Sequence, residues 1–481
     1  MRRRSAALLV VAVAALGGCQ SSPGGSPAPP SVGSTAGATT GSVGSVGSAA
    51  GTSWSGLAPC PDKPTLQCGT LRVPLDRSAP GGGTVDLAVV VGGNPGADRT
   101  MVFLTGGPGQ GGAAAAARVF PRFAEVGARQ RIVMLDQRGT GAGALQCPEL
   151  QDQMRSSDLT VPSEAAVTAC ATTIGAARAH YATSDTVADL EDLRAALGAP
   201  RWSLDGVSYG SYVAQRYAAA HPDRVDKLVL DSVVPVTGFD PLLTDVYPEV
   251  ARVLRDVCAK SGCDEDPAEA IDATVRRWPD LGPVLLDVVT GMSVAEPTFQ
   301  GFLPALFQAA AGNDAPIRTF ADGWRSADTT VASSLSQGLH ASTLCLDLDF
   351  PWGGADSDPA GRAADVEAKV GALAPDQLFP FGATAAGGNG EVVTCRVWPR
   401  TPDSWSEAEA RAAATTLATL GPRTLILAGD RDLSTPLVWA KATAAAMPGS
   451  TLVVVPDTGH SVQSRGGPVG GAKATAFLLA P

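Results

Sequence analysis

The sequence has few of the patterns that several classes of protein require. It contains only four histidines and no Cys-x-x-Cys pair among its nine cysteines, so the usual spacing of a zinc site is missing. No basic cluster follows Arg4, and the net charge of −11 argues against binding to nucleic acid. We therefore expect no metal, no other cofactor and no nucleic-acid partner.

The N-terminal residues predict export. Arginines at positions 2–4 precede an apolar stretch at 6–16 that is too short to span a bilayer. The sequence Leu-Gly-Gly-Cys that ends at Cys19 resembles a bacterial lipobox, in which cleavage before Cys19 exposes a thiol that is then diacylated. The alternative is a plain secretory signal with an incidental cysteine, and the arginines fit Sec and twin-arginine export equally. The first interpretation predicts an extracytoplasmic lipoprotein anchored to the cell membrane.

The spacing of apolar runs predicts a mostly parallel sheet flanked by helices. Two strands near the C-terminus are separated from the others by nearly two hundred residues that carry helical spacing in places. The predicted strands are 70–75, 85–91, 100–104, 132–135, 202–205, 227–231, 425–427 and 452–455.

This pattern predicts an α/β fold with a large, mainly helical cap inserted after the sixth strand. Residues 20–52 are rich in Ser, Gly, Pro and Ala without periodicity, which predicts a flexible tether. The predicted organisation is a lipoprotein signal peptide (1–19), the tether (20–52), the first part of the core (53–234), the cap or lid (235–400) and the second part of the core (401–481).

A Gly-x-Ser-x-Gly pattern surrounds Ser208, between a strand-like run and a helix-like run at 209–220. This context is that of the nucleophile elbow of α/β-hydrolases, where a tight turn lifts a serine hydroxyl above the sheet. A Cβ at Gly206 or Gly210 would collide across such a turn. The pattern also arises by chance in a chain of this composition, so it needs support from the rest of the site.

A serine nucleophile needs a base and an orienting acid, which follow it in the order Asp or Glu, then His, in this fold. His460 is the histidine that directly follows a strand in that order, whereas His180, His221 and His340 fit surface, capping or cap positions. As the acid, Asp432 is preferred to Asp430, because Asp432 lies farther past the strand end. Asp430 would then bind backbone in the turn.

An oxyanion that develops in the reaction needs preorganised N–H donors. In this fold one donor is the residue after the nucleophile, here Tyr209, and the other follows the third strand. The glycine-rich turn at 106–109 follows the strand at 100–104, which makes Gly107 the second predicted donor.

These motifs, together with Asp-Gln-Arg-Gly at 136–139, resemble the prolyl aminopeptidase-related α/β-hydrolases. Within that group the chain is similar to the secreted tripeptidyl aminopeptidase-like hydrolases of high-GC Gram-positive bacteria, over nearly everything after about Ala58. The segments 345–347 and 395–399 resemble the C-terminal region of that subfamily. Thr105 stands where prolyl aminopeptidases often have a histidine, which counts against strict proline specificity.

Eight cysteines remain after Cys19, an even number that favours disulfides in an exported chain. Their spacing suggests that neighbours pair, and the resemblance supports the last of the pairs. The predicted disulfides are Cys60–Cys68, Cys147–Cys170, Cys258–Cys263 and Cys345–Cys395.

The resemblance implies a serine hydrolase that removes short peptides or single residues from free N-termini through an acyl-enzyme. Such an enzyme needs a carboxylate for the substrate ammonium, for which Asp347 is the candidate, with Glu249 and Asp349 as others. A carboxylesterase or lipase acting on small esters would use the same triad. A non-catalytic binding lipoprotein is the third interpretation.

Overall fold

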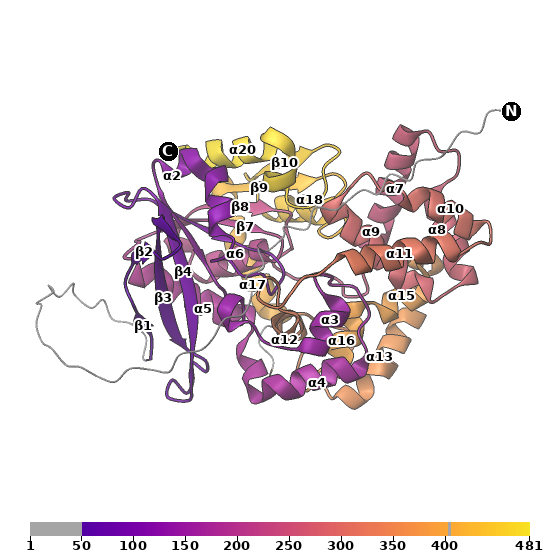
Figure 1. The fold of residues 1–481 in the computed structure, drawn as a ribbon, viewed down its shortest axis with the longest axis horizontal. Helices are drawn as coiled ribbons and strands as arrows, with labels where there is room; N and C mark the ends of the chain where they lie inside the picture. The colour runs from indigo at the N-terminus through magenta and orange to yellow at the C-terminus, as the bar shows by residue number, and fades with distance from the viewer. Residues whose placement is uncertain (1–50, 403–405) are drawn as a thin grey trace, which may run out of the picture. The chain divides into compact units, whose positions relative to one another are not determined.

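The computed structural model describes residues 51–402 and 406–481, and its ribbon is drawn in Figure 1. A ten-stranded sheet runs through this part of the chain. The predicted signal peptide, the lipidation site Cys19 and nearly all of the tether lie outside the described residues.

The sheet has a parallel part and an antiparallel part, in the order β1-β3-β4-β6-β5-β7-β8-β9-β10, with β2 paired to β3. Antiparallel pairing joins β1 (Ser53–Trp54), β2 (Ala58–Cys60), β3 (Lys63–Pro74) and β4 (Thr84–Gly93), and β4 is antiparallel to β6. The parallel strands are β5 (Thr100–Leu104), β6 (Arg131–Leu135), β7 (Trp202–Val207), β8 (Val225–Asp231), β9 (Thr424–Gly429) and β10 (Thr451–Val455).

Helices cover both faces of the sheet. Alternate residues of each central strand point to opposite faces, and the side chains on both faces are apolar and buried. In β5, Val102 and Leu104 pack in one apolar core, and Met101 and Phe103 pack in the other. The first face carries α5 (Thr183–Ala196), α6 (Tyr209–Ala220), α17 (Glu407–Ala418) and α18 (Leu437–Ala446). The second carries α1 (Ala116–Val119), α2 (Ala124–Gly127), α19 (Val462–Arg465) and α20 (Gly467–Leu479).

The predicted fold class is therefore confirmed, with differences at one edge of the sheet. The strands β1 and β2 were not predicted, because they are only two and three residues long and carry no alternation. The predicted sixth strand, which precedes the helical insertion, is therefore the eighth strand along the chain, β8. The strand β3 begins at Lys63 rather than at residue 70.

A large helical region lies between β8 and β9 and has its own apolar core. In Figure 1 its helices α7 to α11 lie together, away from β3 and β4. The helices are α7 (Val246–Ser261), α8 (Pro267–Arg277), α9 (Leu281–Ala295), α10 (Phe302–Ala310), α11 (Ala315–Ala327), α12 (Gln337–Asp347), α13 (Pro359–Gly371), α14 (Pro375–Leu378), α15 (Gly382–Gly388) and α16 (Gly390–Val397).

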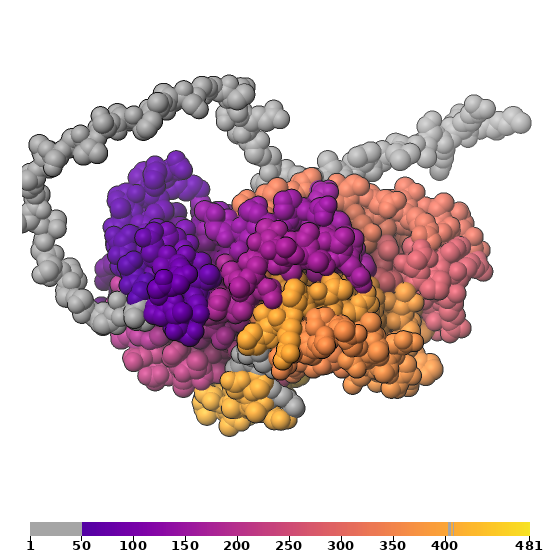
Figure 2. Space-filling model, turned by 90° about the horizontal axis from the view of Figure 1, so that it is seen from below, coloured from indigo at the N-terminus to yellow at the C-terminus, as the bar shows by residue number. Residues whose placement is uncertain are grey.

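A second segment, outside the predicted cap, packs with this helical region. The helices α3 (Pro148–Met154) and α4 (Glu164–Ile174) follow β6 and share a buried cluster with α12 and α16. Figure 2 shows the purple surface of the residues near 150–175 beside the orange surface of the later helices. The sequence predicted that residues 53–234, which include α3 and α4, form the first part of the core, but the apolar faces of these helices are buried against the insertion.

The structure contains the four disulfides Cys60–Cys68, Cys147–Cys170, Cys258–Cys263 and Cys345–Cys395. Cys345 and Cys395 join α12 to α16 inside the buried cluster and are 50 residues apart in sequence.

We expect the double substitution C345S/C395S to lower the free energy of unfolding by about 4 kcal/mol. The same change at Cys258 and Cys263, which are five residues apart, should cost about 2 kcal/mol, because a shorter loop restricts the unfolded chain less. Guanidinium unfolding of the two variants and the wild type measures both changes. Equal losses would show that chain entropy does not set the contribution of the 345–395 bond.

Candidate active site

The polypeptide turns sharply from β7 into α6 at Ser208, with φ 57° and ψ −129°. A non-glycine residue adopts this backbone only where its surroundings enforce it. A Cβ added at Gly206 would lie 2.2 Å from the carbonyl oxygen of Gly210, and one added at Gly210 would lie 2.3 Å from that of Leu104. Glycine at both positions is what allows the turn to close and leaves Ser208 half-buried at the sheet edge.

His460 and Asp432 meet in a buried contact beyond the ends of β9 and β10. The imidazole Nδ1 lies 2.9 Å from Asp432 Oδ2. Asp432 is 1% exposed, and its carboxylate also accepts hydrogen bonds from the amides of Ser434 and Thr435 and from the Thr435 hydroxyl. These bonds fix the carboxylate, which in turn holds the imidazole at Nδ1.

The two groups shift each other's pKa in the direction a catalytic pair requires. Burial alone would raise the pKa of Asp432, but the charge and hydrogen bond of His460, with the bonds from Thr435, bring it below its usual value. Burial likewise would lower the pKa of His460, but the charge and hydrogen bond of Asp432 raise it above its usual value, aided by Asp231. Asp432 is thus an anion that stabilises the imidazolium.

Ser208 and His460 are held at the same edge of the sheet through Asp231. The Ser208 amide donates to the Asp231 carbonyl at 3.0 Å, and the Asp231 carboxylate accepts from the amides of Val462 and Gln463, two and three positions after His460. Within the described residues no hydrogen bond joins Ser208 Oγ to His460. Such bonds are often long before substrate binds.

Two main-chain amides beside Ser208 are available to an oxyanion. A Cβ on Gly106 would lie 3.4 Å from Ser208 Oγ, so the turn after β5 borders the hydroxyl. The Gly106 amide is occupied by Gln110 Oε1 at 3.2 Å. The amides of Gly107 and Tyr209, in contrast, donate no hydrogen bond to any atom of the described chain.

One residue of the helical region holds both loops that carry His460 and Asp432. Ser293, in α9, is fully buried. Its carbonyl accepts from the His460 amide at 3.2 Å, and its hydroxyl accepts from the Leu433 amide at 3.0 Å. A Cβ on Gly459 would lie 1.8 Å from the same carbonyl, which explains why glycine precedes the histidine. The helical region is therefore bonded directly to the site.

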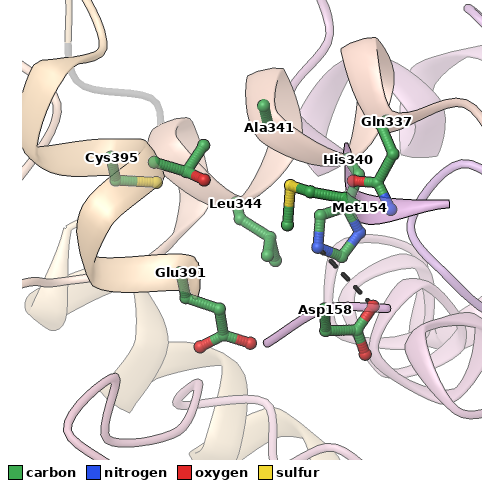
Figure 3. A pocket seen from close by; sticks show the side chains of 9 residues that line it. Met154, Asp158, Gln337, His340, Ala341, Leu344, Glu391 and Cys395 are labelled. Atoms are coloured by element: carbon green, nitrogen blue, oxygen red, sulfur yellow. Dashed lines mark ion pairs between the residues drawn. The ribbon is translucent and has the colours of Figure 1, made fainter. Parts of the chain in front are cut away.

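A small pocket lies where α3, α12 and α16 meet (Figure 3). Its polar lining includes Asp158, from the loop after α3, His340 in α12 and Glu391 in α16. His340 Nδ1 lies 3.1 Å from the carbonyl oxygen of Pro108, in the turn beside Ser208, and His340 Nε2 lies 3.6 Å from Asp158 Oδ1. The cavity has room for one group about the size of a water molecule.

The pocket is electrostatically incomplete. Figure 3 shows the ion pair between Asp158 and His340, with the Glu391 side chain in the lining of the same pocket. Burial raises the pKa of both, and the charge of Asp158 adds to the rise at Glu391, whereas the imidazoliums of His340 and His460 act to lower the pKa of Asp158. Among the described residues, Glu391 Oε2 and His340 Nε2 are buried without a hydrogen-bond partner. Both atoms line the pocket and are available to bond a polar or cationic group that enters it.

The acidic residues predicted for substrate binding do not line this pocket. Asp347, at the end of α12, is 7% exposed and accepts from the Thr183 amide at the start of α5, at 3.0 Å. Glu249 pairs with Arg252 within α7, and Asp349 is exposed. Asp430 is half-buried at the end of β9, and no hydrogen bond between its side chain and His460 is present in the described structure.

The sequence interpretation missed Asp158 and Glu391 and treated His340 as a surface or cap residue. Neither carboxylate belongs to a local motif, because they are more than two hundred positions apart. One sequence feature could have indicated Glu391: it lies four residues before Cys395, in a segment that the predicted disulfide places inside the protein.

The described residues contain no group of three His, Cys, Asp or Glu side chains arranged to hold a metal ion. Nor does this part of the chain include a helix with the length and apolarity needed to cross a bilayer.

Two family models match the chain. One, described as the alpha/beta hydrolase fold, matches residues 99–254, and the other, described as TAP-like protein, matches residues 380–481. The first therefore covers the strands on both sides of Ser208, and the second covers Glu391, Asp432 and His460.

Curated relatives match over different shares of their lengths. The tripeptidyl aminopeptidase of Streptomyces coelicolor is 33% identical over 190 residues, which are 35% of each chain. The serine protease Hip1 of Mycobacterium tuberculosis is 30% identical over 237 residues, 43% of this chain and 44% of Hip1. The chain thus spans about a third to under half of these proteins.

A probable proline iminopeptidase of Streptomyces coelicolor is 33% identical over 328 residues, which are 61% of this chain and 91% of that protein. This coverage, together with the two family models, confirms the resemblance inferred from the motifs. The chain belongs to the α/β-hydrolases of the tripeptidyl and prolyl aminopeptidase kind.

Proposed function

We propose that this protein is an exported serine peptidase that releases short peptides or single residues from free N-termini. Ser208 attacks the scissile carbonyl while His460 takes its proton and returns it to the leaving amine. Asp432 orients the imidazole and stabilises its cation. The amides of Gly107 and Tyr209 bind the oxyanion, and water then hydrolyses the acyl-enzyme.

The observation that supports an aminopeptidase activity, rather than hydrolase activity in general, is the presence of Asp158 and Glu391 in one pocket. A free N-terminus is an ammonium group close to water in size, and it would supply a cationic partner to Glu391, which forms no ion pair within the described residues. His340 links Asp158, at 3.6 Å, to the carbonyl oxygen of Pro108, at 3.1 Å, so an ammonium held there would lie beside the turn that borders Ser208. The related proteins named as aminopeptidases support the same class.

We expect Glu391→Gln to lower kcat/KM for free tripeptide anilides by at least about 30-fold, mainly through KM. Removing one partner of a buried charge pair typically costs 2 kcal/mol or more. The same variant should hydrolyse N-acetylated amino-acid esters at close to the wild-type rate. Glu367→Gln, an identical change on the exposed face of α13, is the matched control and should leave both reactions unaltered.

The wild-type rate for free peptides should also depend on pH in a bell shape. The rate rises with pH as the carboxylates of Asp158 and Glu391 ionise. Burial raises the pKa of both groups, so this rise lies at higher pH than for exposed carboxylates. The rate falls as the substrate amine loses its proton near pH 8. Equal turnover of free and acetylated peptides would refute the aminopeptidase. Turnover of acyl esters alone would establish the carboxylesterase or lipase, and no turnover in either panel would favour the binding lipoprotein.

We also propose that the protein is a lipoprotein on the outer side of the cell membrane. The basic and apolar N-terminal residues, the lipobox-like sequence before Cys19 and the four disulfides support export. Labelling with a radioactive or clickable fatty acid should mark the wild type and not Cys19→Ser. Unlabelled wild type, with secretion intact, would favour the plain signal.

A further inference from the structure

Asp231 makes contacts on both sides of the site that the triad chemistry does not explain. It is the last residue of β8 and is fully buried, with β7 and β9 as its neighbours in the sheet. On one side, its carbonyl accepts the amide of Ser208 at 3.0 Å. This bond fixes the main chain of the nucleophile.

On the other side, the Asp231 side chain holds the chain that follows His460. Its Oδ1 accepts the Val462 amide and its Oδ2 accepts the Gln463 amide, both at 2.9 Å. The neighbouring hydroxyl of Ser232 accepts the amide of Ser461 at 2.8 Å. Three successive amides after the histidine are thus bound by two adjacent residues.

We propose that Asp231 is a positioning residue that fixes Ser208 and His460 relative to each other and adds a second negative charge behind the imidazole. Its carboxylate, with Asp432, stabilises the imidazolium that forms when Ser208 is deprotonated. The inference rests on the proposed roles of Ser208 and His460 but not on the choice of an N-terminal substrate.

The charges around Asp231 come from every element packed against it. They belong to Asp205 in β7, Asp432 after β9, His460 after β10, Arg465 in α19 and Arg122 in the short helix Phe120–Phe123. No cation forms an ion pair with Asp231 in the described part of the chain. The cation that its charge stabilises is therefore the imidazolium of His460.

Protonation states in this cluster follow from burial. Burial raises the pKa of Asp231 to about 6, although the amides of Gln463 and Val462 and the charge of His460 oppose the rise. Burial raises the pKa of Asp205, which accepts from Gln463 Nε2 at 2.8 Å, to about 8. At neutral pH Asp231 is therefore the ionised member, and acid removes its charge as the pH falls through about 6, while acid also protonates His460, whose pKa is raised.

The test uses an N-acetylated amino-acid ester, so that Asp158 and Glu391 do not influence the pH profile. In Asp231→Asn we expect kcat per fluorophosphonate-labelled site to fall about 10- to 100-fold with little change in KM, as for a small misplacement of reacting groups. The acid limb should move to lower pH, because the imidazolium loses a stabilising charge. Its slope should fall from above one in the wild type to one.

Ser232→Ala is the matched control, because it removes a bond to the same loop without changing a charge. It should lower kcat modestly and leave the acid limb in place. The proposal is overturned if Asp231→Asn keeps the wild-type kcat and the wild-type pH profile. It is also overturned if the only change in this variant is a lower melting temperature. If Asp231→Asn does not fold, a wild-type acid limb with a slope of one overturns it. Full activity in Ser208→Ala would instead show that the proposed function itself had failed.

Discussion

Ser208→Ala is expected to lower kcat by about 10⁴- to 10⁶-fold on every substrate the enzyme accepts, and to abolish labelling by a fluorophosphonate. The reason is chemical, because without the hydroxyl no acyl-enzyme can form and only the oxyanion donors and substrate binding remain. The fold should be little affected, since Ser208 Oγ makes no hydrogen bond in the described structure.

Ser326→Ala, an exposed serine on α11, is the control and should label and turn over normally. Equal labelling of Ser208→Ala and wild type would mean that another residue is the nucleophile. A normal rate without labelling would show that no covalent intermediate involves Ser208.

Asp432→Asn should lower kcat by about 10⁴-fold. An amide in this position can hold the imidazole in the wrong tautomer and no longer stabilises its cation. The pH profile gives a second readout. His460 must be neutral to act as a base, so wild-type kcat/KM falls as the pH drops through its raised pKa. Without the Asp432 charge that pKa falls, and the acid limb of the residual activity should move to lower pH.

Asp430→Asn separates the two acids that the sequence offered. It has the same chemistry two positions away and should keep kcat within about threefold of wild type. A large loss in Asp430→Asn, with a mild effect in Asp432→Asn, would reverse the assignment of the acid.

Sequence patterns could predict the sheet because its central strands are short buried runs bounded by turn residues. The strand β5 and the helix α6 coincide with their predicted bounds, and only the very short β1 and β2 were missed. The contact of Asp432 with His460 could be predicted because the fold fixes the order of the acid and the histidine along the chain.

The pocket could not be predicted in the same way. Its walls come from α3, α12 and α16, which meet only because apolar faces far apart in sequence bury one another. Asp347 stays a candidate from the sequence, but its burial and its bond from the Thr183 amide depend on tertiary packing. Short-range patterns carry no information about such packing.

The two bonds of Ser293 limit how a substrate can reach Ser208. Because Ser293 in α9 bonds the main chain of both loops that carry Asp432 and His460, α9 cannot move outward without breaking the bonds to the His460 and Leu433 amides. A hinged lid that carries α9 would therefore inactivate the enzyme each time it opened. We therefore expect substrate entry and product exit to use motion of other segments, with α9 staying in place during turnover.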